Sequence, residues 1–243
     1  MNRLSMTALF GWMVAIALVA VGCALGSWQL RRMHQKESML AEVASVIANR
    51  TARPLGVAAD ATRSRGYDWA AGEGRFLTQA AWLLDNQQRE GRPGVRVFRL
   101  FQPEGGMPLL VEMGWLPVGA GREMPVVGAA PEGRMVIRGL LLPPPSRGLM
   151  SGAESATSDG QHLVIGLDAA RIAARAGLPA IAPRVLRLDP ALPIGHARDL
   201  DVLPNTLPPE RHLGYAVQWF ALAAAVLVIA LLLTLRHRRR LRP

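Results

Sequence analysis

Two uncharged apolar stretches, one near each end of the chain, dominate its hydropathy pattern. The first runs from about residue 7 to residue 28, and the second from residue 215 to residue 235. A helix rises about 1.5 Å per residue, so about 20 apolar residues cross the hydrocarbon core of a bilayer. Only a helix satisfies its own backbone polar groups there. The pattern predicts membrane-spanning helices over 7–28 and 212–235, with residues 1–6 and 236–243 outside them.

The intervening residues 29–211 carry the pattern of one mainly β domain. Short apolar or alternating runs are separated by segments rich in Gly, Pro and polar residues, which favours an antiparallel sheet. The predicted strands are 67–77, 81–84, 95–101, 109–116, 135–142, 163–166 and 185–188, with a turn over 85–94, a loop over 146–160 and a helix over 168–176. Arg96 and Arg99 alternate with apolar residues and are interpreted as a solvated sheet face. The predicted fold class is therefore membrane α+β: two transmembrane helices that bracket a barrel-like external domain with an accessory helix.

The residues that follow the first span continue its helical pattern to about residue 50. Gln29, Arg32 and Lys36 share one face of that helix. Residues 51–66, rich in Arg, Gly, Ala and Pro, are predicted to form a loop.

The formal net charge of +10 is concentrated at the C-terminus, where residues 236–242 include five arginines. The domain itself is only mildly basic, so the charge is poor evidence for nucleic-acid binding. Basic residues beside a span favour the cytoplasmic side. The tail therefore predicts that both termini are cytoplasmic and that the domain is periplasmic, although Arg31, Arg32 and Lys36 favour the opposite orientation.

The single cysteine, Cys23, lies inside the first apolar stretch. It excludes an intrachain disulfide. A cleaved signal peptide is an alternative for this stretch, but the apolar run is long for one. A lipoprotein site at Cys23 is a second alternative, for which Ala20 is a poor first residue. The simplest interpretation is a small residue in a spanning helix.

Gly22 and Gly26 form a G-x-x-x-G pair in the first span. Such a pair permits close approach of two membrane helices. The second span, with Ala221, Ala223 and Ala224, is the natural partner.

A search for catalytic motifs is largely negative. Lys36 is the only lysine, and no motif pairs it with a nucleophilic serine. The five histidines lack the spacing of a metal site, and no Gly-rich phosphate loop follows a strand. We therefore expect a protein that is not an enzyme.

One cluster of polar and aromatic residues lies at the start of the second span. On a helix, His212, Tyr215 and Trp219 lie within about 60° of one another. Aromatic residues at this depth are ordinarily membrane anchors, and a histidine near a helix start is ordinarily solvated. The alternative is a site for a flat apolar ligand, with a neutral imidazole available to a metal. Trp28 and Gln29, at the end of the first span, are expected at the same depth.

Four motifs, in this order, resemble those of the surfeit locus protein 1 family of cytochrome c oxidase assembly factors. They are Gly26-Ser27-Trp28-Gln29-Leu30-Arg31-Arg32 with Lys36, then Gly74-Arg75-Phe76 with Leu84-Asp85-Asn86, then Glu112-Met113-Gly114-Trp115-Leu116-Pro117, and finally His212-Leu213-Gly214-Tyr215-Ala216-Val217-Gln218-Trp219-Phe220. The chain departs from the family pattern at Glu210 and at Glu112-Met113. A span that begins near residue 7 favours a somewhat divergent bacterial member, in the cell inner membrane.

The resemblance implies a non-enzymatic role in maturing the haem–copper centre of oxidase subunit I, with haem a as the bound group and haem a synthase as a further partner. Carried over, His212 is the implied ligand of the haem iron, and Tyr215 and Trp219 are the walls of its pocket. Trp28, Gln29 and Arg32 complete this implied site. An interaction scaffold for oxidase subunits that binds no haem is the main alternative, and a membrane-anchored hydrolase is a third.

Overall fold

The computed structural model describes residues 6–145, 155–157, 159–203 and 207–240. The chain divides into two compact units, which are treated separately. One contains the residues up to 41 and those from 206 onward, and the other contains residues 42–205.

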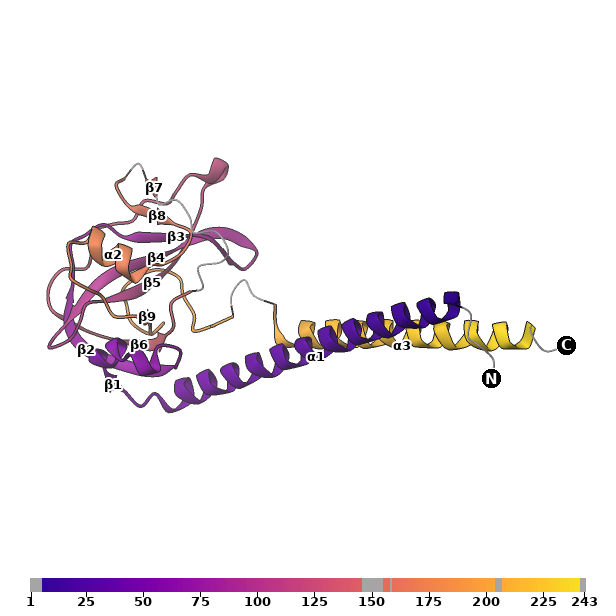
Figure 1. The fold of residues 1–243 in the computed structure, drawn as a ribbon. Helices are drawn as coiled ribbons and strands as arrows, with labels where there is room; N and C mark the ends of the chain where they lie inside the picture. Colours follow the sequence, from indigo (N-terminus) through magenta and orange to yellow (C-terminus); the bar gives the residue numbers. More distant parts are fainter. Residues whose placement is uncertain (1–5, 146–154, 158, 204–206, 241–243) are drawn as a thin grey trace. The chain divides into compact units, whose positions relative to one another are not determined.

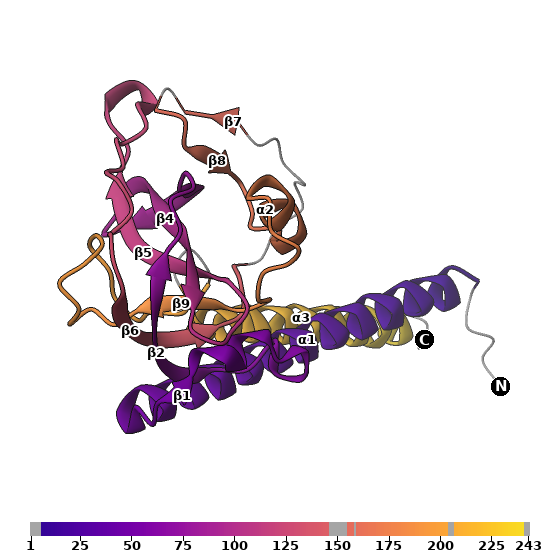
Figure 2. The ribbon, with the colours of Figure 1, turned by 90° about the vertical axis from the view of Figure 1, so that its left-hand side faces the viewer.

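The first unit is a pair of long helices, α1 (Met6–Asn49, of which the residues after Ala41 belong to the second unit) and α3 (Pro209–Arg240). The two run side by side and antiparallel in both views (Figure 1, Figure 2). Near one end, the indole Nε1 of Trp12 donates a 3.0 Å hydrogen bond to Thr234 Oγ1. Both helices are long and apolar enough to cross a membrane. The prediction of two long apolar helices at the ends of the chain is confirmed.

The seam between the helices follows a repeat of three and four residues. Its buried positions include Ala15, Gly22, Gly26 and Lys36 on α1, and Pro209, His212, Ala216 and Ala223 on α3. This spacing keeps one face of each helix toward the other, as in a left-handed helix pair. Aliphatic side chains on the outer faces, such as Ile16 and Leu232, are exposed.

The two glycines of the G-x-x-x-G pair lie in this seam. A Cβ atom added to Gly22 would lie 3.0 Å from Ala223 Cβ, and one added to Gly26 would lie 2.7 Å from the ring of Phe220. Such contacts leave no room for a larger side chain. The predicted approach of the two helices at these glycines is confirmed, with Ala223 as the small residue that faces Gly22.

The second unit is built around a curled, mainly antiparallel sheet. Its strands are β1 (Arg53–Pro54), β2 (Asp68–Phe76), β3 (Trp82–Arg89), β4 (Arg92–Pro103), β5 (Leu109–Pro117), β6 (Met135–Leu142), β7 (Ser155–Ala156), β8 (His162–Val164) and β9 (Val185–Leu188). Among the described residues they form one nine-stranded sheet in the order β1-β2-β6-β9-β5-β4-β3-β8-β7. Strand β2 pairs with both β6 and β4, so the pairing of β2, β6, β9, β5 and β4 closes on itself.

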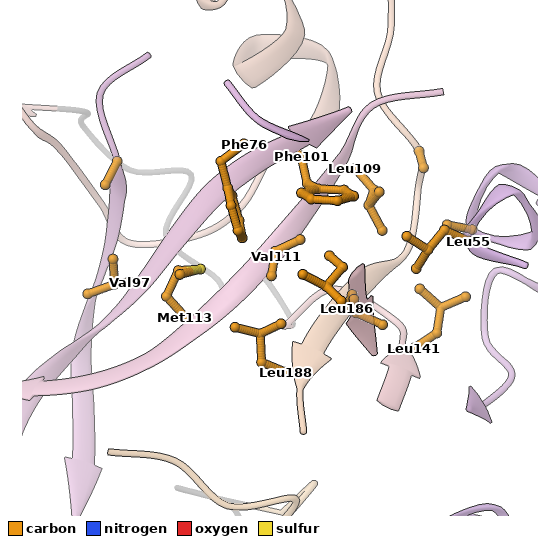
Figure 3. Packing of buried hydrophobic residues seen from close by; sticks show 14 of the residues in the cluster. Leu55, Phe76, Val97, Phe101, Leu109, Val111, Met113, Leu141, Leu186 and Leu188 are labelled. Atoms are coloured by element: carbon orange, nitrogen blue, oxygen red, sulfur yellow. The ribbon is translucent and has the colours of Figure 1, made fainter. Parts of the chain in front are cut away.

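The main core lies on the face of these strands that the curled sheet encloses (Figure 3). Phe76 meets Phe101 edge to face, with ring centroids 5.1 Å apart. Val97 and Phe101 on β4, and Val111 and Met113 on β5, contribute alternate side chains. This period of two is the pattern from which the strands are predicted.

A second core lies on the opposite face of β4, where α2 (Ala169–Arg175) packs. It includes Phe98, Leu100 and Ile172. Asp168 caps α2 by accepting hydrogen bonds from the backbone N–H groups of Ala170 and Arg171. The predicted accessory helix is confirmed. Strand β4 is therefore buried on both faces.

Two local predictions are wrong. Arg96 and Arg99 do not form a solvated face, since they are 9% and 5% exposed, because both faces of β4 are covered. Most of residues 85–94 is strand, not turn: β3 continues to Arg89, and the reversal is confined to Glu90 and Gly91, both with positive φ.

The segment predicted as a loop over 51–66 holds β1 and two short 3₁₀ helices, η1 (Leu55–Ala59) and η2 (Ala61–Arg63). A third, η3 (Ala120–Arg122), follows β5. Residues 146–154 and 158 of the predicted loop 146–160 lie outside the described residues, and β7 lies within the rest of it.

Candidate functional site

The candidate site lies between α1 and α3, where the sequence predicts it. His212 stands in the first turn of α3 and faces α1. Its Nδ1 atom lies 2.7 Å from Gln29 Oε1, although 183 residues separate the two along the chain. The side chain of His212 is buried. The structure therefore brings together two of the six predicted site residues through a direct hydrogen bond.

This hydrogen bond selects a state of the imidazole ring. An amide oxygen only accepts hydrogen bonds. Nδ1 of His212 therefore carries the ring proton and donates a hydrogen bond to Gln29 Oε1. In the neutral ring, Nε2 then holds a lone pair. Nε2 is buried and has no hydrogen-bond partner among the described residues. A ring nitrogen oriented by a bond at the opposite nitrogen is the usual form of a metal-binding histidine.

The three aromatic residues of the predicted site differ in how far they are buried. Trp219 is half-buried and stands on the seam, two turns after His212. Tyr215 and Trp28 are 42% and 52% exposed, so they lie on the outer surface of the helix pair. Trp219 is thus placed as a wall of the seam, whereas Tyr215 and Trp28 present their rings to the surroundings of the pair.

Two cations lie close enough to His212 for their charges to act on its ring. One is Arg32, a predicted site residue, which is exposed and whose guanidinium lies 3.4 Å from Gln35 Oε1. The other is Lys36, which is buried and whose Nζ donates to the backbone carbonyl of Leu207. Lys36 belongs to the first of the four motifs but is not among the six predicted site residues. Its position seven residues after Gln29, which is the seam repeat, is the signal that identifies it.

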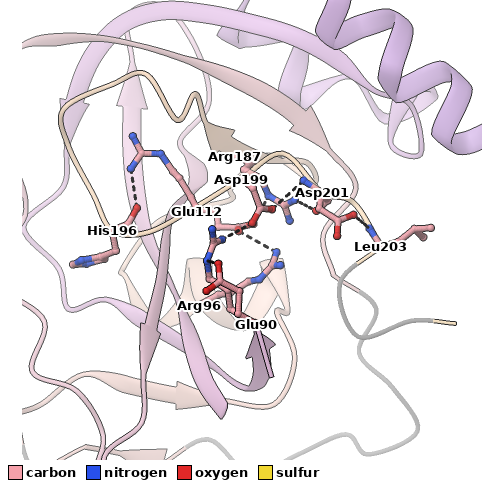
Figure 4. Close-up of polar contacts among 10 residues, drawn as sticks. Glu90, Arg96, Glu112, Arg187, His196, Asp199, Asp201 and Leu203 are labelled. Atoms are coloured by element: carbon pink, nitrogen blue, oxygen red, sulfur yellow. Dashed lines mark hydrogen bonds and ion pairs between the residues drawn. The ribbon is translucent and has the colours of Figure 1, made fainter. Parts of the chain in front are cut away.

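A separate cluster of buried charges lies in the sheet domain (Figure 4). Glu112 on β5 accepts a 3.0 Å hydrogen bond from Arg96 on β4 and another of 3.0 Å from Arg187 on β9. The guanidinium of Arg187 also donates to the backbone carbonyl of Asp201. Glu112 is therefore the anion that holds two neighbouring strands, β4 and β9, to β5.

Two further buried carboxylates are held by arginines. Asp68 accepts a 2.7 Å hydrogen bond from the fully buried Arg184 and one of 2.8 Å from Arg63. Burial alone would raise the pKa of Asp68, but the hydrogen bonds from Arg184 and Arg63 outweigh it and lower the pKa. The pKa of Asp189 is lowered in the same way, since a 2.8 Å hydrogen bond from Arg138 outweighs the effect of burial. These groups are ionised at neutral pH and stabilise the domain.

A metal site built from several protein ligands gains no support from the described part of the chain. No group of three or more His, Cys, Asp or Glu side chains in the described part of the chain is placed to hold a metal ion. A haem iron, whose porphyrin supplies four nitrogen ligands, needs only an axial ligand from the protein. Nε2 of His212, which has no hydrogen-bond partner among the described residues, is the candidate for such a ligand.

The family model described as SURF1 family matches residues 16–224, which include most of α1, the first half of α3 and the whole sheet domain. No curated protein matches the chain.

Proposed function

Because the chain belongs to the SURF1 family, a family of oxidase assembly factors, we propose that it binds haem a between α1 and α3 and positions it for insertion into subunit I of a haem–copper oxidase. The observation that carries the proposal is the buried Nε2 of His212, which has no partner among the described residues while Gln29 orients the ring. Haem a supplies the iron that a neutral imidazole coordinates.

Each neighbouring side chain has a defined part in this proposal. Gln29 keeps the lone pair of His212 on Nε2. Arg32 and Lys36 supply positive charge for the haem propionates, which are carboxylates. Trp219, Tyr215 and Trp28 offer aromatic surface to the macrocycle. None of these side chains is asked to make or break a bond, as expected of a family that is generally non-enzymatic.

The proposal includes a membrane topology. The chain lies in the bacterial inner membrane with two spans, both termini in the cytoplasm and the sheet domain in the periplasm. Five arginines at the C-terminal end of α3 and just after it support this orientation. The haem site then lies toward the periplasmic ends of the spans. Oxidase subunit I is the proposed recipient, and haem a synthase is the proposed donor.

The test is the visible spectrum of the full-length protein purified in detergent from cells that make haem a. Wild type is expected to carry haem, and His212→Gly is expected to lose it, because the axial ligand is gone. Added imidazole should restore the absorption bands of His212→Gly, an effect that a merely structural role would not produce. Gln29→Leu should retain less haem than wild type.

His34→Ala is the matched control. His34 lies on α1, the helix that carries Gln29, but its side chain is exposed and contacts Glu37. Its substitution should leave the spectrum unchanged. Haem-free wild type, or an unaltered spectrum in His212→Gly, would rule out the ligand role. Haem-free wild type that still co-purifies oxidase subunits would instead identify an interaction scaffold.

A further inference from the structure

Arg99, in the sheet domain, differs from the other buried arginines of that domain in the groups that it contacts. It stands on β4 with 5% of its surface exposed. Its guanidinium lies 3.5 Å from the backbone carbonyl of Gln79 and donates to that of Gly128. Both partners are neutral. No carboxylate pairs with Arg99 among the described residues.

The other buried arginines in the described part of the sheet domain all have an anion. Arg96 and Arg187 share Glu112, and Arg184 pairs with Asp68. Burying a cation without a counter-ion is costly. Burial lowers the pKa of Arg99, but a guanidinium remains charged at neutral pH. The fold therefore keeps one buried positive charge that the neighbouring side chains leave unbalanced.

Arg99 lines a cavity of about 920 Å³ in the sheet domain. The cavity is bounded by the end of β2, by β4 and by residues 127–134. Gln79 also lines the cavity, and its side-chain oxygen Oε1 is buried and without a hydrogen-bond partner among the residues described. The wall thus holds an unbalanced cation and an acceptor that needs a donor.

The remaining charges of the cavity wall largely cancel. Arg134 forms ion pairs with Glu73 and with Glu104, which also lines the cavity. Arg75 and Glu132 are exposed side chains of opposite charge. Arg99 is left as the charge that a ligand would meet in the interior.

We propose that this cavity binds an organic acid, whose carboxylate pairs with Arg99 and whose neighbouring hydroxyl or amide N–H donates to Gln79 Oε1. A carboxylate supplies the missing counter-ion in the planar form that a guanidinium prefers. Two sources carry this chemistry: a free 2-hydroxy acid and the C-terminal carboxylate of a peptide with its own amide N–H. The site does not depend on the haem proposal, because it lies wholly within the sheet domain.

The experiment measures the thermal unfolding midpoint of the full-length protein in detergent, with each probe in millimolar excess. The probes are L-lactate, N-acetyl-alanyl-alanine and the C-terminal amide of that peptide. A ligand that binds the native state raises the midpoint. At least one acid should raise the midpoint of wild type but not that of Arg99→Met, and the amide should have no effect. The more effective acid identifies the source.

Two further variants complete the test. Gln79→Leu should reduce the shift, and it replaces Arg99→Met if that variant fails to fold. Arg75→Met is the matched control, because it removes an exposed cation of the same cavity and should keep the shift. The proposal is overturned if no acid shifts wild type, if the amide acts as strongly as the acid, or if Arg99→Met responds as wild type does.

Discussion

Among single residues, Glu112 carries a buried negative charge that two arginines of the sheet domain share. Its two carboxylate oxygens bind separate arginines, Arg96 and Arg187, and all three residues are at most 9% exposed. Removing the anion from such a cluster leaves two buried cations uncompensated, and water does not reach them readily. The stability of three adjacent strands, β4, β5 and β9, therefore depends on one carboxylate.

We expect Glu112→Gln to lower the free energy of unfolding by about 3–5 kcal/mol, the usual effect of breaking a buried ion pair from one side. Chemical denaturation of the full-length protein in detergent measures it. Glu90→Gln is the control, since the Glu90 side chain is 82% exposed and its effect should stay within about 0.5 kcal/mol. Equal effects of the two substitutions would contradict a stabilising role for the cluster.

At the scale of elements, the helix pair depends on close approach at its glycines. Gly22 faces Ala223 in the seam, whereas a Cβ atom at Gly11, on the same helix, would meet nothing within 4 Å. The same residue type is thus required at one position and replaceable at the other. Small residues matter in membrane helix pairs because packing, not the hydrophobic effect, drives the association.

Gly22→Leu should therefore destabilise the pair by about 1–3 kcal/mol, as overpacking does. Gly11→Leu should be close to neutral. Thermal unfolding of both variants in the same detergent gives the comparison, and haem content gives a second readout, because His212 and Gln29 lie on the same seam. If Gly11→Leu proved as damaging as Gly22→Leu, the seam would not be the feature that requires glycine.

For the whole molecule, the proposed topology places the sheet domain and the basic C-terminal residues on opposite sides of the membrane. Single cysteines in a Cys23→Ser background test this assignment. Arg92→Cys replaces the exposed first residue of β4, and His237→Cys lies among the arginines at the C-terminal end of α3 and keeps all five of them. An impermeant maleimide added to spheroplasts should label position 92 at once, and position 237 only after permeabilisation. The reverse pattern would invert the topology.

The sequence by itself determined the features that depend on neighbours along the chain. Apolar length predicted the two long helices, alternation predicted most strands, and the helical character of residues 168–176 predicted α2, because these signals are read within one turn or one strand. The four ordered motifs also identified the family. The prediction of where β3 ends was wrong. The chain reverses between β3 and β4 with only two residues of positive φ, Glu90 and Gly91, and the polar residues before them belong to the strand.

Only the tertiary structure decided which polar side chains are buried and what they meet. Alternation along β4 indicates two faces, but not that both are covered, so the burial of Arg96 and Arg99 was missed. The bond between Gln29 and His212 joins residues 183 positions apart, and no local pattern reports such a distance. The exposure of Tyr215 and the burial of Lys36 depend likewise on the packing of α3 against α1. Contacts between residues that are distant along the chain bury a charge or a ring nitrogen and decide whether it finds a partner. These contacts exist only in the folded molecule.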